Sequence, residues 1–303
     1  MENDIISDIN NLKKEKDVVI LAHYYVDGAV QEIADYVGDS FYLAKVATKV
    51  KESNILFAGV SFMGESAKIL NPSKKVVMVD CNADCPMAHM VTKEKIEEVR
   101  AAYDDLAVVC YVNSTAEIKS VSDVCVTSSN ALNVVRNVKA KNIFFVPDNN
   151  LGRYIATKLP EKNFIFNDGF CHVHKSISKE DVENAKLARP DAEVLTHPEC
   201  TMDVLEISDF IGSTSEIIDY ATASDKKEFI ICTEMGVFFE LMQKNPDKKF
   251  YSVGHRQFCP NMKLVTLDKV KSALETMEPE VILPDEIMET AKRPLELMLE
   301  LAQ

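Results

Sequence analysis

The sequence predicts an α/β fold in which three related αβα units, each with a short parallel sheet, surround a central cavity. The first observation is a pattern, LAHYYVDGAVQEIADYVGDS from Leu21, that returns near Val109 and again near Leu195. The second is that short apolar runs alternate with helical segments, as in parallel sheets covered on both faces. The third is that one cysteine of each copy keeps the same register. We expect units at 1–86, 87–172 and 173–262, with a C-terminal strand and helix in 263–303 docking on them.

The three copies share polar positions and begin about 87 residues apart, a spacing that suits small sub-domains. They start at His23, Tyr111 and His197. Two residues on stand Tyr25, Asn113 and Glu199; twelve on stand Asp35, Asp123 and Asp209; seventeen on stand Ser40, Ser128 and Thr214. Functional groups gather at the carboxyl ends of parallel strands, so three such units would point these side chains into one cavity. The alternative is that the repeat records gene duplication and the polar positions only build loops.

Each copy predicts the same order of elements. Apolar residues at helical spacing predict a helix over 3–14, followed by a buried strand over 18–22. Each copy then has a helix (29–36, 116–121 or 202–207) and a short strand. A further helix starts at Ser40, at Ser128 or at the capping box Ser213-x-x-Glu216. Next come a strand (55–60, 143–146 or 229–232), a helix such as 65–70 in the first copy, and a last strand before the copy's cysteine.

Another helix opens seven residues after each of these cysteines, at Thr92, Ser178 and Thr266. The tail begins a fourth copy at Asp285 but is too short to finish it. We therefore expect the strand Val281–Leu283 and the helix after Pro284 to dock on an existing unit.

Composition and charge exclude several classes of protein. The chain has 303 residues, 47% hydrophobic and 27% charged, which is typical of a soluble globular protein. No apolar run is long enough for a membrane span, and the polar N-terminus is unlike a signal peptide, so we expect a cytoplasmic protein. A net charge of −14 without clustered Lys and Arg argues against nucleic acid as a partner. Eight cysteines in such a protein are more naturally thiols or metal ligands than disulfides.

Three of these cysteines are metal-ligand candidates. Cys85, Cys171 and Cys259 follow loop-forming residues and keep register across the copies. By contrast, Cys110, Cys125 and Cys232 lie in apolar strands, Cys200 lies in a loop, and Cys81 is the strongest rival ligand. Three thiolates brought together could hold zinc, or a 4Fe-4S cluster with one iron left open for Lewis acid catalysis.

Acid/base and anion-binding groups surround the same predicted cavity. His23, Tyr25, Tyr111, His197 and Glu199 can exchange protons with a substrate, and Asn113 can orient a carbonyl. The anion-binding candidates, all at predicted helix starts, are Ser40, Ser128, Ser213 and Thr214. Simple N-capping is the alternative role for these hydroxyls.

A series of motifs along the chain resembles the quinolinate synthase family, the second enzyme of de novo NAD biosynthesis from aspartate. From Leu21 to Lys263 they read AHYY, GDS, GVSFMGESAKIL, ADCPMA, YVNSTAEIK, CVTSSNA, GFCHVH, HPEC, GSTSEI, TEMG and CPNMK. The resemblance implies a condensing transferase that joins iminoaspartate to dihydroxyacetone phosphate, loses phosphate and water, and closes the ring of quinolinate. It also implies a 4Fe-4S cluster held by one cysteine from each of three domains, and handover of the unstable imine from an aspartate oxidase or dehydrogenase.

The resemblance can be transferred residue by residue. It puts Cys85, Cys171 and Cys259 at the cluster-ligand positions, and the acid/base and anion-binding candidates named above at active-site positions. Two departures stand out: only Cys259 remains of a CxxCxxC run found in longer members, and His172 and Cys81 are additional.

Two other functions use part of the same evidence. A different hydro-lyase with an open-iron cluster would need the same cysteines. An electron carrier or redox sensor would need no His, Tyr and Glu beside the metal, and would favour ligation by four cysteines.

Overall fold

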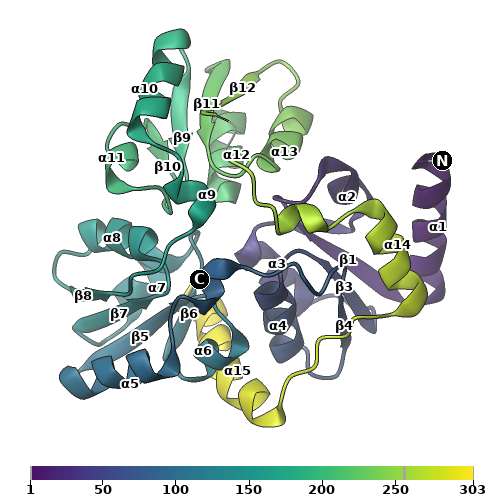
Figure 1. The fold of residues 1–303 in the computed structure, drawn as a ribbon, viewed down its shortest axis with the longest axis horizontal. Helices are drawn as coiled ribbons and strands as arrows, with labels where there is room; N and C mark the ends of the chain where they lie inside the picture. Colours follow the sequence, from purple (N-terminus) through teal and green to yellow (C-terminus); the bar gives the residue numbers. More distant parts are fainter. Residues whose placement is uncertain (1, 255–256, 303) are drawn as a thin grey trace.

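The computed structural model describes residues 2–254 and 257–302 and has the predicted α/β architecture. It contains three sheets of four parallel strands, each covered by helices, and Figure 1 shows them around a common centre. Sheet order is the same in each: the second strand of the unit, then the first, the third and the fourth. The predicted fold class is confirmed. The predicted unit boundaries stay predictions, although the strands of each sheet all fall within one predicted unit.

The elements of the first unit follow the expected order. They are α1 (Glu2–Glu15), β1 (Val18–His23), α2 (Gly28–Ile33), β2 (Tyr36–Gly38), α3 (Ser40–Ala47), β3 (Asn54–Ala58), α4 (Ser61–Leu70), β4 (Lys75–Met78) and a 3-10 turn (Pro86–His89). The helix expected over 29–36 ends at Ile33, because Tyr36 is taken into β2 beside Leu21.

The second and third units repeat this order. The second contains α5 (Lys93–Ala102), β5 (Leu106–Tyr111), α6 (Ala116–Ser120), β6 (Val124–Val126), α7 (Ala131–Asn137), β7 (Asn142–Val146), α8 (Asn149–Lys158) and β8 (Asn163–Phe166). The third contains α9 (His172–Lys175), α10 (Lys179–Ala188), β9 (Glu193–Thr196), α11 (Met202–Leu205), β10 (Phe210–Ile211), α12 (Thr214–Ala223), β11 (Glu228–Cys232), α13 (Val237–Lys244) and β12 (Lys249–Ser252). The helix expected at Ser128 begins three residues later, at Ala131, because the side chain of Asn130 folds back onto the amide of Thr127 in a turn.

The repeated aspartates have a structural role. The carboxylates of Asp35, Asp123 and Asp209 each accept a hydrogen bond from a backbone amide of the unit's first strand, at 2.8, 2.7 and 2.8 Å. Each bond ties the turn before the second strand to the first strand, beside which the second strand pairs. These aspartates therefore hold the turn before the second strand in place in each of the three units.

The C-terminal segment packs against the first two units. It contains a 3-10 turn (Met262–Leu264), α14 (Leu267–Thr276) and α15 (Asp285–Leu301). The strand predicted at Val281–Leu283 is wrong: one isolated antiparallel bridge joins Glu280 to Val77, since prolines on both sides leave too short a segment to pair further. Helix α15 packs on α6, β6 and α4, so it fills the space between the first two units (Figure 1).

The apolar core is continuous through part of the molecule only. One cluster of buried side chains joins the first unit, the second unit, α14 and α15. The third unit has its own clusters, formed mainly by residues of its own sheet and helices. Tyr24 of the first unit belongs to one of these clusters and Tyr154 of the second unit packs against the other, so apolar contacts join the third unit to its neighbours in addition to the cavity described next.

Candidate functional site

One cavity lies at the carboxyl ends of the three sheets. His23 ends β1, Tyr111 ends β5 and His197 follows β9, so the three repeat starts meet there as predicted from parallel-strand topology. It encloses about 760 Å³ of space, part of it open to solvent. Of the predicted site residues, those that line it are His23, Tyr25, Ser40, Cys85, Tyr111, Asn113, Ser128, Cys171, His197, Glu199, Thr214 and Cys259.

Ser213 is the predicted site residue that the cavity lining leaves out. Its hydroxyl accepts a hydrogen bond from the amide of Glu216, whose side chain returns a bond to the amide of Ser213. This is the capping box expected from the sequence. Because the side chain is fully buried and already used, the structure assigns Ser213 the capping role and not substrate contact.

The cavity cysteines are free thiols in the wall. Cys85, Cys171 and Cys259 are each partly exposed, and none is in a disulfide. Burial raises the pKa of Cys85 to about 12, and it raises the pKa of Cys171 and Cys259 as well. Each thiol therefore keeps its proton until a cation displaces it. Cys81 is exposed and does not line the cavity, so it is not placed to compete for the same position.

The spacing of ligand atoms distinguishes one metal ion from a larger group. Three thiolates on one zinc ion at about 2.3 Å would bring their sulfurs within about 4 Å of one another. Among residues 2–254 and 257–302, the single group of three ligand atoms within 4.8 Å of one another is Cys171, His174 and Glu199. The three cavity cysteines do not form such a group. As placed, the three cavity sulfurs are therefore not gathered around a single ion.

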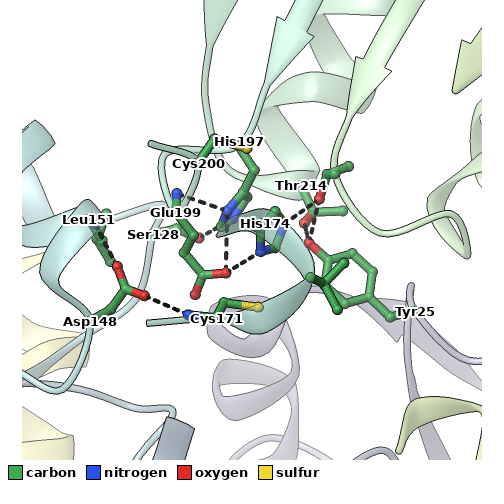
Figure 2. A network of polar contacts seen from close by, with 12 residues as sticks. Tyr25, Ser128, Asp148, Leu151, Cys171, His174, His197, Glu199, Cys200 and Thr214 are labelled. Carbon is green, nitrogen blue, oxygen red and sulfur yellow. Dashed lines mark hydrogen bonds and ion pairs between the residues drawn. The ribbon is translucent and has the colours of Figure 1, made fainter. Parts of the chain in front are cut away.

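A chain of polar contacts crosses the cavity wall, and Figure 2 shows it from close by. Tyr25 Oη lies 2.8 Å from the hydroxyls of Thr214 and Thr233, and the Thr233 hydroxyl lies 2.9 Å from His174 Nε2. On the other side of its ring, His174 Nδ1 lies 2.6 Å from Glu199 Oε2.

The chain continues into the third and second units. Glu199 Oε2 lies 3.6 Å from Nδ1 of His197, and His197 Nε2 lies 3.2 Å from the hydroxyl of Ser128. The rings of His174 and His197 stack, with centroids 4.5 Å apart. The contacts therefore connect Tyr25 of the first unit to Ser128 of the second through groups that can each carry a proton.

Desolvation sets the charge states in this wall. Burial lowers the pKa of His23 and of His197 to about 3, so both imidazoles are neutral at pH 7. Burial and the charge of Glu199 raise the pKa of Tyr25 and Tyr111 well above 10, which keeps both phenols protonated. Burial also acts to raise the pKa of Glu199, but His174, His197 and the Tyr111 hydroxyl outweigh it and hold that pKa at about 2. Glu199 is therefore an anion in this wall.

Two buried oxygens in the cavity have no hydrogen-bond partner within the described part of the chain. They are Oδ1 of Asn113 and Oε1 of Glu199, and both residues line the cavity. Unpaired buried acceptors are costly, so native structures usually supply a partner. Their position indicates that a bound molecule or water provides it.

Helix starts contribute polar groups to the same space. Ser40 is the first residue of α3 and Thr214 is the first residue of α12, and both line the cavity. Free amides and the dipole at these ends attract anions. The Asp39 carboxylate already caps α3 by accepting from the amide of Tyr42 and from the hydroxyl of Ser215. Asp39 therefore adds negative charge at both helix starts, and α12 carries a further carboxylate, Glu216, in its first turn.

Sequence reasoning missed three residues of the wall. His174, Thr233 and Glu234 are fully buried or nearly so; His174 and Glu234 line the cavity, and Thr233 links two of its members. None stands at a repeat start, but Glu234 keeps register with Asp148, since they follow His197 and Tyr111 by the same number of residues, and this signal could have found it. The signal for His174 was its place three residues after Cys171, one helical turn into α9. The additional His172 also lines the cavity.

Comparison with known proteins identifies the family. The model of the quinolinate synthetase A protein family matches residues 7–300. The chain belongs to the quinolinate synthetase A family. Proteins named quinolinate synthase from Fusobacterium nucleatum and Caldicellulosiruptor bescii are 56% identical over 97% of this chain and 98% of theirs, and 51% identical over 97% of each. The one from Clostridioides difficile is 49% identical over the full length of both chains. The resemblance noted in the motifs is confirmed, and membership places the chain among the enzymes of NAD biosynthesis.

The described helices also bear on membrane association. Within residues 2–254 and 257–302, none of them combines the length and the apolar character that crossing a membrane requires.

Proposed function

We propose that this chain is a quinolinate synthase that condenses iminoaspartate with dihydroxyacetone phosphate, with loss of phosphate and water. The observation that carries the proposal is one cavity in which three register-matched cysteines face the polar chain from Tyr25 to Ser128. A redox carrier would not need that chain, and relatives of nearly full length carry the name of the synthase.

Cys85, Cys171 and Cys259 would hold a 4Fe-4S cluster. The fit rests on three thiols in one cavity wall that form no disulfide and whose sulfurs do not all lie within 4.8 Å of one another. Held by three cysteines, the cluster would supply Lewis acid chemistry at the iron that has no protein ligand. The additional group of Cys171, His174 and Glu199 offers a mixed sulfur, nitrogen and oxygen donor set within the same wall.

The side chains around the cavity would position the substrates and move protons. Asn113 and Glu199 each offer an unpaired buried oxygen, which suits the donors of an imine or a hydroxyl group. The amides at the start of α12 and the hydroxyl of Thr214 suit a phosphate or carboxylate oxygen. The negative charges of Asp39, which contacts both helix starts, and of Glu216 in the first turn of α12 oppose phosphate binding at either start.

Ring closure requires several proton transfers, and the polar chain offers a path for them. Glu199 Oε2 and His174 Nδ1 lie close enough to share a proton, and Thr233 links His174 to the phenol of Tyr25. Both phenols keep their protons, so Tyr25 and Tyr111 are suited to donate hydrogen bonds to departing hydroxyl groups. Burial makes His23 and His197 weak bases, so they are suited to hydrogen-bond the substrates in their neutral form.

The proposal also covers how iminoaspartate reaches the enzyme and where in the cell the enzyme works. Iminoaspartate hydrolyses readily, so an aspartate oxidase or dehydrogenase would hand it over directly. Eight free thiols fit the reducing cytoplasm, where we expect the enzyme to work.

The experiment is anaerobic reconstitution followed by assay. Protein loaded with iron and sulfide is mixed with dihydroxyacetone phosphate and with iminoaspartate generated from oxaloacetate and ammonia, and quinolinate is measured by chromatography. We expect quinolinate only when both substrates and the cluster are present. Cluster-loaded protein that forms no quinolinate under conditions in which an authentic synthase does would contradict the proposal.

A further inference from the structure

Each cavity cysteine donates its backbone N–H to a carboxylate. The pairs are Cys85 with Asp84 at 2.8 Å, Cys171 with Asp148 at 3.1 Å and Cys259 with Glu234 at 3.1 Å. A contact of this kind is therefore found at each cavity cysteine, although the carboxylate does not come from the same repeat position in all three units.

Two of these carboxylates are equivalent and fully buried. Asp148 and Glu234 each stand two residues after the third strand of their unit, β7 or β11, and neither is exposed. Each uses its other oxygen at the start of the next helix: Asp148 Oδ1 accepts from the amide of Leu151, and Glu234 Oε2 accepts from the amide of Gly236, both at 2.6 Å. Each carboxylate thus bridges a helix start and a cysteine loop, and both of its oxygens are used.

The first unit is built differently. Its equivalent position is Val60, whose side chain cannot accept a hydrogen bond. There Asp84, adjacent to the cysteine and with 45% of its side chain exposed, accepts through one oxygen from both Cys85 and Ser61. Its second oxygen contacts His89 outside the cavity. This link is local and partly solvated.

Helix capping alone does not explain the buried pair. The start of α5 is capped by Thr92, a neutral hydroxyl, which is a sufficient cap without a buried carboxylate. Burying a carboxylate is costly, and the side chains of Asp148 and Glu234 are both fully buried. Such groups are retained where they orient something, and partners of metal ligands commonly have this role.

We propose that Asp148 and Glu234 are positioning residues that fix the loops of Cys171 and Cys259 in a cluster-ready geometry before the cluster binds. This inference rests on the proposed function, since it takes these cysteines to be cluster ligands. The loop of Cys85 depends on Asp84 instead, so the first ligand is held less firmly than the other two.

The test uses substitutions that keep the helix caps. In Asp148→Asn and Glu234→Gln, the remaining carbonyl oxygen can still cap the helix, while the new NH2 group faces the cysteine amide, donor against donor. Asp84→Asn is the matched control, because its one bridging oxygen can stay an acceptor for both Cys85 and Ser61. Thr92→Ala, at a helix cap outside the cavity lining, controls for general destabilisation.

We expect iron release from the reconstituted full-length protein to a chelator to be about 10- to 100-fold faster in Asp148→Asn and Glu234→Gln. We also expect an altered electron paramagnetic resonance spectrum of their reduced cluster, and a fall in the melting temperature of the cluster-free chain no larger than that of Thr92→Ala. Asp84→Asn and Thr92→Ala should match the wild type in release and spectrum. Unchanged release and spectrum in the first two variants, or equal damage in Asp84→Asn, would overturn the proposal.

A second measurement needs no variant and applies even if a variant fails to fold. In the cluster-free wild type labelled with nitrogen-15 cysteine, the amides of Cys171 and Cys259 should exchange with solvent more slowly than that of Cys85. Equal exchange rates would contradict the positioning role. Wild-type protein that binds no cluster would refute the proposed function, whereas a normal cluster in every variant would refute only this inference.

Discussion

Cysteines in the cavity wall and cysteines inside the sheets have the same side chain in contrasting surroundings. Cys110, Cys125 and Cys232 lie within β5, β6 and β11 with no exposed surface, packed among apolar residues. The cavity cysteines follow loops, are partly exposed and donate their amides to carboxylates. Thiol acidity does not separate the two groups, because burial raises the pKa of Cys232 to about 12 just as it does for Cys85. Register across the repeats and access to the cavity separate them.

The largest expected effect comes from removing a cavity thiol. Cys85→Ala, Cys171→Ala and Cys259→Ala should each fail to retain a 4Fe-4S cluster and lose activity, since the remaining two cysteines cannot hold it. Iron, sulfide and visible absorption of anaerobic protein measure this. Cys81→Ala is the control and should keep its cluster, because Cys81 lies outside the cavity lining. A cluster that survives in Cys85→Ala and disappears in Cys81→Ala would reverse the assignment.

The next effect concerns the acid/base side of the same wall. Glu199→Gln keeps the shape but removes the anion that lies 2.6 Å from His174. We expect turnover to fall about 10²- to 10⁴-fold, the usual contribution of a positioned acid or base, with iron content unchanged. Steady-state kinetics of the reconstituted variant measures the fall. Near-normal turnover would remove Glu199 from the mechanism.

Lowering the pH should reduce the stability of the cavity wall, which contains buried histidines, more than that of the sheet interiors. The folded-state pKa of His23 is lowered to about 3 by burial, against 6.5 when unfolded, so the unfolded chain binds more protons between these values. Stability should therefore fall as pH drops below 6.5, by up to about 1.4 kcal/mol per pH unit for this histidine. Urea unfolding of the cluster-free chain at pH 7, 6 and 5 measures the slope, and His23→Asn should make it shallower. An equal slope in His23→Asn would show that this imidazole is not buried neutral.

The smallest effect comes from the interior cysteines. Cys232→Ala removes one buried sulfur from β11, and we expect a loss of about 1 kcal/mol in the free energy of unfolding through packing alone. Cys110→Ala should behave alike. Both variants should reconstitute a cluster with wild-type iron content, measured beside a denaturant titration. Loss of the cluster in either folded variant would contradict the claim that the interior cysteines serve packing alone.

The repeat made much of the fold and site predictable. It indicated three parallel sheets and one cavity, because Tyr111 and His197 could be aligned with His23 without any structure. It did not lead to His174, which lies away from the repeat starts, or to Glu234, which keeps register with Asp148 but meets its cysteine loop only when the chain folds. Ser213 was predicted as a site residue because its motif fits both a helix cap and a ligand site. The two hydrogen bonds of the capping box, which only the structure shows, identify it as a cap. The failed strand at Val281–Leu283 shows that an apolar run between prolines does not determine pairing.

The central claim is that three cysteines hold a cluster whose fourth iron has no protein ligand. Mössbauer and hyperfine spectroscopy on protein reconstituted with iron-57, with and without quinolinate labelled in its nitrogen or carboxylate oxygens, tests it most directly. We predict one iron site of four that differs from the other three and couples to the labelled product. Four equivalent sites, or product that is bound while every iron stays unperturbed, would contradict it.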